Sequence, residues 1–156
     1  MRKRNSLFLK MQKTETPETE NAAGHLLSHK NLKLTPIRLE VLSYLLTSLT
    51  AVSKSKIEDH FDAYDRITIY RTIKSLVEKE VIHRIIGMDG EVKFAVNNDP
   101  VMVPNKTNNS HVHFHCLKCE ATFCMAIKIP KIEVPENFQM INSNYSIEGI
   151  CKNCPK

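Results

Sequence analysis

The stretch HVHFHCLKC, residues 111–119, and the stretch ICKNC, residues 150–154, set the architecture of this chain. Together they contain two C-x-x-C pairs with 31 residues between them: Cys116 with Cys119, and Cys151 with Cys154. A C-x-x-C turn can point two sulfurs at one ion, and two such turns complete a tetrahedron with bonds of about 2.3 Å. The spacing therefore predicts a zinc site of four thiolates that closes a small C-terminal module.

The alternative for these cysteines is a pair of disulfides in a secreted protein. The N-terminal stretch MRKRNSLFLKMQ is basic, but its apolar run is too short for the core of a signal peptide. No apolar run reaches the roughly 18 residues that a membrane helix needs. We therefore expect a cytoplasmic protein without membrane association, in which thiols stay reduced and hold zinc.

The composition is that of an ordinary globular protein. Hydrophobic residues make up 42% and charged residues 25% of the 156 residues, and the formal net charge is +5. This excess is modest and spread along the chain, so it permits nucleic-acid binding without demanding it. Four thiolates around one zinc subtract about two charges from the C-terminal module. A DNA-binding surface is therefore expected in the N-terminal half.

The first part of the chain reads as a tail followed by helices. Residues 1–22 are predicted to be a disordered basic and polar tail, because their polar run has no apolar period. A short helix is expected over residues 22–32. Thr35 followed by Pro36 is typical of an N-cap and first helical position. The next helix carries a buried stripe at helical spacing: Val41, Leu42, Leu45, Leu46 and Leu49.

Two further helices and a hairpin follow. Ser53 is predicted to cap a third helix, and Asp65 a fourth that runs to about Lys79. The β-rich runs 81–86 and 91–96 flank a glycine-containing turn and predict a β-hairpin. Helices followed by a hairpin are the element order of a winged helix, here assigned to residues 23–98, with the fourth helix as the recognition helix.

Beyond residue 98 the composition changes. Residues 99–110 are rich in Asn and Pro and are predicted to be a hinge linker. In the C-terminal domain, residues 111–156, strands are expected at 111–114, 121–129 and 145–150. The stretch 132–142 fits either a helix or an irregular crossover. The fold class is thus α+β, a winged helix followed by a small α/β dimerisation domain with a four-cysteine zinc site.

Four motifs in this order resemble the ferric uptake regulator family. They are Leu34-Thr35-Pro36-x-Arg38-x-x-Val41-Leu42, Ile67-Thr68-Ile69-Tyr70-Arg71-Thr72-Ile73, His111-x-His113-Phe114-x-Cys116-x-x-Cys119, and Cys151-x-x-Cys154. The resemblance covers about residues 25–156. It implies a homodimeric, metal-dependent transcriptional repressor that binds a palindromic operator in double-stranded DNA. It also implies a regulatory metal between the two domains, and the zinc-sensing branch is one option.

The expected DNA contacts lie on or near the fourth helix. Arginine can reach guanine or phosphate, and tyrosine can contact a thymine methyl group or bond a phosphate. The alternative is that these are ordinary polar residues on a solvated helix face. With the resemblance, we expect DNA contacts from Arg38, Tyr70, Arg71 and Lys74.

A second metal site is predicted from alternating histidines. His111, His113 and His115 share one face of a strand. In the family, the positions of His111 and His113 hold regulatory or accessory ligands. The position eight residues after Cys116 is usually a carboxylate, but here it is Cys124. His83 matches a wing position that supplies a ligand in some zinc-sensing relatives, so the tentative regulatory set is His83, His111, His113 and Cys124, with His115 as a further option.

Other interpretations remain open for these residues. His83 also fits a wing histidine near phosphate, and Cys124 a small buried hydrophobe in a strand. Glu120, where the family usually has glycine, fits either a ligand or a surface charge. The wing glutamate of iron sensors is absent, and Ala51-Val52 replaces a common histidine. A thiolate among imidazoles favours Zn²⁺ over Fe²⁺ or Mn²⁺ as the regulatory metal, unless the site is degenerate.

The function that follows is metal-responsive repression of metal homeostasis genes, with structural zinc and a regulatory divalent metal at the hinge. The alternative is a constitutive or redox-controlled DNA-binding dimer whose only metal is the structural zinc. An enzyme with a small-molecule substrate is not expected, because four thiolates leave zinc no open position for catalysis.

Overall fold

The computed structural model describes residues 17–87, 90–97, 111–125, 127, 129, 132–141 and 143–155. These residues form four helices and six strands. The N-terminal part contains α1 (Pro17–His29), α2 (Pro36–Thr47), β1 (Val52–Ser53), α3 (Lys54–His60), α4 (Arg66–Glu78), β2 (Ile82–Ile86) and β3 (Val92–Val96). The C-terminal part contains β4 (Val112–Cys116), β5 (Thr122–Met125) and β6 (Tyr145–Gly149). The expected tail at 1–16 and linker at 99–110 lie outside the described residues.

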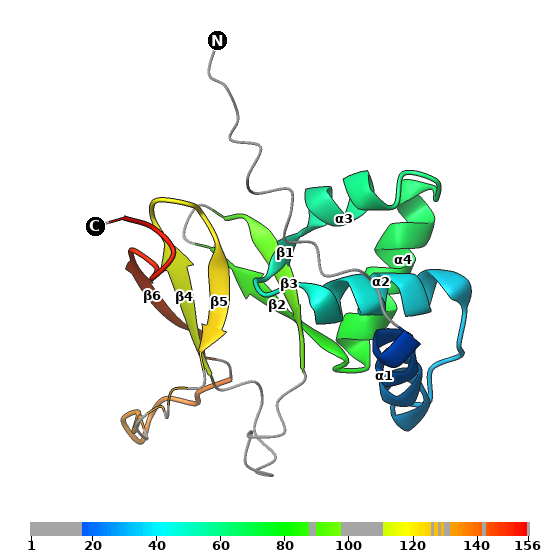
Figure 1. The fold of residues 1–156 in the computed structure, drawn as a ribbon. Coiled ribbons are helices and arrows are strands. Elements are labelled where there is room, and N and C mark those ends of the chain that lie inside the picture. Colours follow the sequence, from blue (N-terminus) through cyan, green and yellow to red (C-terminus); the bar gives the residue numbers. More distant parts are fainter. Residues whose placement is uncertain are drawn as a thin grey trace.

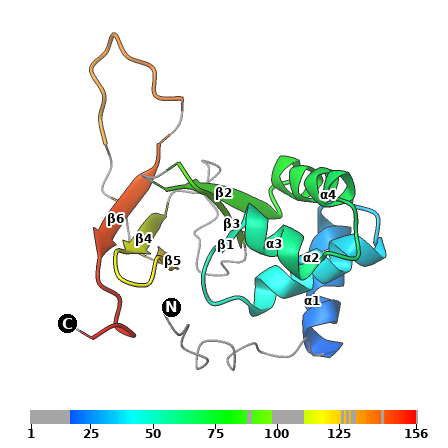
Figure 2. The same cartoon turned by 90° about the horizontal axis from the view of Figure 1, so that it is seen from above.

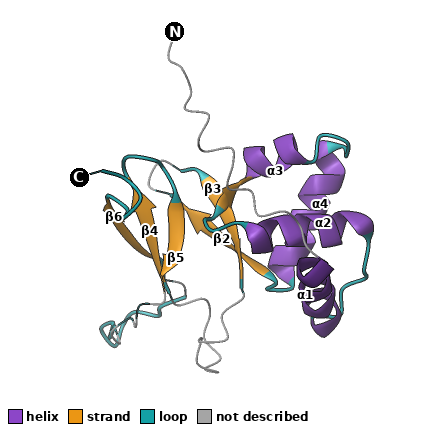
Figure 3. Cartoon of the chain, in the orientation of Figure 1, coloured by secondary structure: helices purple, strands orange, loops and turns teal. Residues whose placement is uncertain are grey.

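The elements form three layers (Figure 1). The helices cover one side of the first sheet, and the second sheet lies on its other side (Figure 3). The view from above gives the same order, with residues 132–141 projecting away from both sheets (Figure 2). The first sheet, β1-β3-β2, is antiparallel throughout. In the second, of order β5-β4-β6, β4 pairs antiparallel with β5 and parallel with β6.

Local signals fix the ends of α4. The Asp65 side chain accepts from the Thr68 backbone N–H at 2.9 Å, which satisfies one of the free donors at the helix start. At the other end Glu80 has a left-handed φ of 53°. Its N–H reaches the Val77 carbonyl, and the Val81 N–H reaches the Leu76 carbonyl, both at 2.9 Å. This is a Schellman motif, which ends the helix and directs the chain into β2.

The helix and hairpin predictions are confirmed for α2, α3, α4 and the pair β2–β3, with four differences in detail. First, α1 begins at Pro17, so residues 17–22 are helical rather than part of a disordered tail. Second, α2 ends at Thr47, and Leu49 is 75% exposed instead of continuing the buried stripe. Third, the short strand β1 was not predicted. Fourth, β5 ends at Met125. The described residues of 132–142 are irregular, which is one of the two options expected for this stretch.

The hydrophobic core lies between the helices and the first sheet. All of its fully packed members fall between Ala23 and Phe94, including Leu42, Ile57 and Leu76, which have no exposed surface. The C-terminal module contributes few buried apolar side chains, among them Val112. The N-terminal domain therefore carries its own core, whereas the module needs another source of stability. Within the described parts of the chain, no helix is long and apolar enough to cross a membrane.

Candidate metal centres and nucleic-acid interface

Four potential metal ligands meet where the two sheets face each other. His83 comes from β2, His111 precedes β4, His113 lies on β4 and Cys124 lies on β5. Their donor atoms all lie within 4.8 Å of one another. The strand register contributes directly, because His113 is paired with Cys124 across β4 and β5 and paired residues share a face. We call these four residues the junction cluster.

The distances in the junction cluster suit a tetrahedral ion. Nε2 of His113 lies 3.3 Å from Nε2 of His83, and Sγ of Cys124 lies 3.5 Å from the same nitrogen. With zinc bonds of about 2.0–2.1 Å to nitrogen and about 2.3 Å to sulfur, the edges of a tetrahedron are roughly 3.3 Å between nitrogens and roughly 3.5 Å between nitrogen and sulfur. The His111 ring lies 4.8 Å from the His83 ring and 4.5 Å from the His113 ring, centroid to centroid. The donor set therefore fits a zinc-sized ion.

Asn97 sets the form of His83 that can bind a metal. Its Nδ2 donates to the Glu80 carbonyl at 3.0 Å, and its Oδ1 lies 2.6 Å from Nδ1 of His83. A carbonyl only accepts, so the amide nitrogen must face Glu80 and the amide oxygen must face His83. The proton of neutral His83 therefore sits on Nδ1. This leaves the lone pair of Nε2 directed at His113 and Cys124, as in metal sites where a second group orients a histidine ligand.

Burial keeps two of these histidines neutral. His83 is 4% and His113 6% exposed. For both, burial is the main cause that lowers the pKa to about 4, and neighbouring His111 lowers it further. At His83, the hydrogen bond that Nδ1–H donates to Asn97 opposes the lowering of the pKa. At His113, the neighbouring Asn144 side chain opposes it. At neutral pH both imidazoles are therefore free bases, the form that ligates a metal. Cys124 is exposed, which contradicts its interpretation as a buried hydrophobe.

The second cluster consists of the four cysteines Cys116, Cys119, Cys151 and Cys154, and their sulfurs also lie within 4.8 Å of one another. The sulfur of Cys116 is 3.9 Å from that of Cys154, and Cys119 is 3.7 Å from Cys151. Bonds of about 2.3 Å to one zinc give tetrahedral edges of roughly 3.8 Å. The four cysteines of this cluster are free thiols, so the structure does not contain the disulfides of the alternative interpretation.

The backbone helps to ionise this thiol cluster. The Cys151 N–H donates to Sγ of Cys116 at 3.3 Å, and this bond is the largest cause that lowers the pKa of the Cys116 thiol. Burial and the neighbouring sulfurs raise the pKa of Cys154 instead. Four close thiols cannot all ionise without a cation between them, and Zn²⁺ supplies the charge that makes four thiolates stable.

Two sequence candidates lie outside both clusters. His115 points to Thr122, with 3.2 Å between Nδ1 and Oγ1, so the option of His115 as a junction ligand is not realised. Glu120 is exposed and has a φ of 61°, the left-handed region that favours glycine. This explains why glycine would suit the position, and Glu120 is not a member of either cluster.

Three of the four residues expected to contact DNA are exposed on α4. Tyr70 on α4 is 53% exposed, and Arg71 and Lys74 are also exposed on this helix. The Lys54 ammonium lies 5.8 Å from the centre of the Tyr70 ring, and Lys74 is 3.8 Å from Glu78. Arg38, on α2, is half-buried and donates to the Lys33 carbonyl at 3.0 Å.

A winged helix joined to a four-cysteine module, with a second ligand cluster between them, defines a metal-responsive transcription regulator. The chain belongs to the ferric uptake regulator family, because the model of that family matches residues 29–151. A comparison with curated proteins found no match.

Solved structures of similar fold include several regulators. The chain matches a zinc uptake regulator complexed with zinc and DNA at a TM-score of 0.61 and 19% identity, covering 91% of this chain and 96% of that one. It matches holo XcZur at a TM-score of 0.62 and 20% identity, covering 89% and 98%. It also matches the Helicobacter pylori ferric uptake regulator, reported to have three functional metal-binding sites, at 0.55 and 19% identity, covering 90% and 94%. At these identities the likeness supports the fold alone.

Proposed function

We propose that this chain is a homodimeric repressor that binds a palindromic operator in double-stranded DNA when a second metal occupies the junction cluster. Cys116, Cys119, Cys151 and Cys154 hold a structural zinc, and His83, His111, His113 and Cys124 hold the regulatory metal. The observation that carries the proposal is the position of the junction cluster, because its ligands come from both domains. The free thiols suit a reducing compartment such as the cytoplasm.

The donor set favours zinc as the regulatory metal. Three imidazoles and one thiolate suit a borderline to soft ion, whereas Mn²⁺ prefers oxygen ligands and Fe²⁺ sites usually include carboxylates. The described residues of the junction cluster include no carboxylate. This supports the zinc-sensing branch of the family over iron and manganese sensors, for control of metal homeostasis genes.

Metal binding is coupled to the arrangement of the two sheets, because each sheet supplies some of the ligands. His83 stands on the first sheet, and His113 and Cys124 on the second. The metal, when bound, supplies a positive charge shared by these donors, and only the facing arrangement of the sheets allows them to share it. Occupancy therefore shifts the population towards that arrangement. A 100-fold gain in DNA affinity requires a coupling of only about 2.7 kcal/mol.

The proposed DNA surface is the exposed side of α4. We propose that Tyr70 and Arg71 reach base edges, and Lys74 and Arg38 phosphates, when α4 enters the major groove. Two such helices in a dimer read two half-sites, so the operator is expected to be palindromic.

The proposed dimer surface lies on the C-terminal module. Among the described residues, ten of the fifteen exposed large hydrophobic side chains lie between Leu117 and Ile150. The strand β6 is at the edge of its sheet, and its Ile147 is 46% exposed. An apolar edge strand of this kind is normally covered by a partner, and a second copy of the chain is the partner we propose.

The decisive experiment counts metals and measures DNA binding in the same preparations. We expect native mass spectrometry to find one EDTA-resistant zinc per chain and a second, reversible metal, with Zn²⁺ bound more tightly than Fe²⁺ or Mn²⁺. DNA selected in vitro with the zinc-loaded protein then gives the operator. His113→Ala is expected to lose the second metal and metal-dependent operator binding, and to keep the fold. His29→Ala, which removes an exposed histidine of α1, is the matched control.

Operator binding by His113→Ala that equals the wild type would refute the regulatory assignment. One zinc with no second metal would favour the alternative, a constitutive or redox-controlled DNA-binding dimer. The exposure of Cys124 gives the redox version a specific target, since an accessible thiol is open to oxidation.

A further inference from the structure

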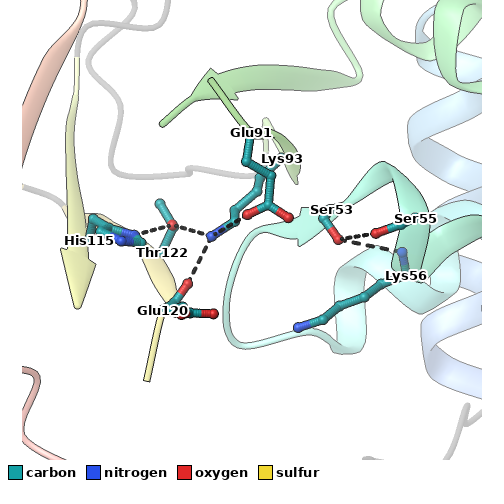
Figure 4. Close-up of polar contacts among 8 residues, drawn as sticks. All are labelled: Ser53, Ser55, Lys56, Glu91, Lys93, His115, Glu120 and Thr122. Atoms are coloured by element: carbon teal, nitrogen blue, oxygen red, sulfur yellow. Dashed lines mark hydrogen bonds and ion pairs between the residues drawn. The ribbon is translucent and has the colours of Figure 1, made fainter. Parts of the chain in front are cut away.

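A buried lysine crosses from one domain to the other beside the junction cluster (Figure 4). Lys93 lies on β3 of the first sheet and is 8% exposed. Its ammonium donates to the Glu120 carbonyl at 2.8 Å and to Oγ1 of Thr122 at 3.2 Å, both in the C-terminal module. It also pairs with Glu91 at 3.1 Å on its own side. A buried charge needs such partners, because its lost hydration is otherwise uncompensated.

The strand registers align Lys93 with the junction cluster. In the first sheet His83 is paired with Ala95 and Ile85 with Lys93, so His83 and Lys93 lie on the same face. In the second sheet Cys124 is paired with His113 and Thr122 with His115, again on one face. The two facing sheets are therefore joined at two neighbouring levels, one formed by His83 with Cys124 and one by Lys93 with Thr122.

The acceptors of Lys93 are held by the turn that follows the first C-x-x-C pair. The Glu120 N–H donates to the Cys116 carbonyl and the Cys116 N–H to the Ala121 carbonyl, at 2.8 and 2.9 Å. The left-handed backbone of Glu120 belongs to this turn, which exposes its carbonyl to Lys93. One further bond crosses the junction, from the Ala51 N–H to the Thr122 carbonyl at 2.8 Å.

We propose that Lys93 is a positioning residue that ties the first sheet to the second without a metal, and so presents His83 to His113 and Cys124. The part of this inference that concerns metal affinity rests on the proposed function; the tie itself does not. A ligand that binds only one conformation has an apparent Kd equal to its intrinsic Kd divided by the fraction of protein in that conformation. Loss of the tie lowers this fraction and weakens the second metal site, although every ligand remains.

The test replaces Lys93 by methionine, which keeps an unbranched side chain and removes the ammonium. Lys54→Met, which makes the same change at an exposed lysine paired with Glu58, is the control. The full chain is studied first with zinc at the four cysteines only, after EDTA treatment. The Ala51 amide reports on the junction because its acceptor, the Thr122 carbonyl, lies in the other domain. The Val81 amide, bonded to Leu76 within the first domain, is the internal reference.

We expect hydrogen exchange of the Ala51 amide to be at least tenfold faster in Lys93→Met and unchanged in Lys54→Met, with Val81 unaffected in both. The Kd for the second zinc, measured by competition with a chelator, should rise about tenfold, equivalent to about 1.4 kcal/mol. Thr122→Val, which removes one acceptor, should change both quantities in the same direction by less. It also provides a second variant if Lys93→Met does not fold.

Three outcomes separate the claims. Unchanged Ala51 exchange in Lys93→Met and Thr122→Val would overturn the tie. Faster Ala51 exchange with an unchanged Kd for the second zinc would overturn the positioning role. A wild-type chain that binds no second metal would refute the proposed function and the positioning role together, and Ala51 exchange would still decide whether the tie exists.

Discussion

At the scale of single residues, His83 depends on Asn97 for its metal-binding form. The amide of Asn97 is fixed between the Glu80 carbonyl and Nδ1 of His83, so the end of α4 orients the imidazole through one side chain. Removing such an orienting group typically weakens metal binding by 10–100-fold.

The corresponding prediction is that Asn97→Ala weakens the second zinc by about 10–100-fold, because His83 loses both its tautomer preference and its ring orientation. Chelator competition measures the affinity for the second zinc. The zinc held by the four cysteines should remain bound after EDTA treatment. Asn97→Asp, which keeps an acceptor for Nδ1–H, should lose less. Equal affinity in Asn97→Ala and the wild type would contradict the role of Asn97.

A second prediction at this scale concerns protons. The pKa of His83 and His113 is about 4 in the folded chain and about 6.5 in a free histidine. The unfolded chain therefore binds more protons between these values, so this contribution to stability is complete above about pH 6.5 and is lost as the pH falls towards 4. At pH 6 both imidazoles are therefore neutral, so a metal that binds their free ring nitrogens displaces no proton from them.

Binding of the second zinc at pH 6 should therefore release no more than two protons, because only His111 and Cys124 remain as sources within the cluster. Calorimetry in two buffers with different ionisation enthalpies measures this number. Release of three or four protons would mean that one or both of His83 and His113 are protonated in the folded chain.

At the scale of elements, the strands of the C-terminal module are short and its apolar core is small. The strand β5 has four residues, and β6 is exposed over most of its length. Gly149 lets β6 approach the Phe114 ring, since a Cβ there would lie 3.1 Å from it. The buried side chains at the centre of this module include Cys116 and Cys151, where a larger domain would bury large hydrophobic residues.

We therefore predict that Cys116→Ala removes the EDTA-resistant zinc and unfolds residues 111–155, because structural zinc contributes folding free energy directly. The helices α1–α4 should remain, since no described residue beyond Val96 packs into their core. Amide exchange resolved by region distinguishes the two parts. Cys124→Ala, outside this cluster, should keep the tight zinc. A stable, dimeric Cys116→Ala chain would contradict the structural role.

At the scale of the whole molecule, the two sheets face each other, and the junction cluster and the bond from Lys93 to Thr122 lie between them. Exposed apolar side chains remain on the C-terminal module, outside this junction. The proposed dimer uses that surface. Ile147 lies at the exposed edge formed by β6, so a charge there should be buried without a partner when two copies associate.

Ile147→Lys is accordingly expected to convert the dimer into a monomer, whose mass is 17.9 kDa. Light scattering after gel filtration gives the mass. Leu49→Lys changes an equally apolar and more exposed residue of the N-terminal domain, and this variant should stay dimeric. An Ile147→Lys dimer as stable as the wild type would place the interface elsewhere.

Features that depend only on residues close together in the sequence could be predicted from the sequence alone. The C-x-x-C spacing, the caps at Ser53 and Asp65, and the alternation of His111 and His113 act within a few residues, so their patterns are directly visible. The start of α1 was also signalled locally, by Pro17 and the acidic residues Glu18 and Glu20, but its weak apolar period concealed it. Packing of Ala23 and Leu27 into the core accounts for that helix.

Which distant residues meet was visible only in the folded chain. His83 and Cys124 are 41 positions apart, and Lys93 and Thr122 are 29 apart, yet each pair is in contact across the two sheets. Asn97, Lys93 and Thr122 are common polar residues in strands or at their ends, and no local pattern marks them as functional. Their roles arise from the packing of one sheet face on the other, which brings each side chain to its partner.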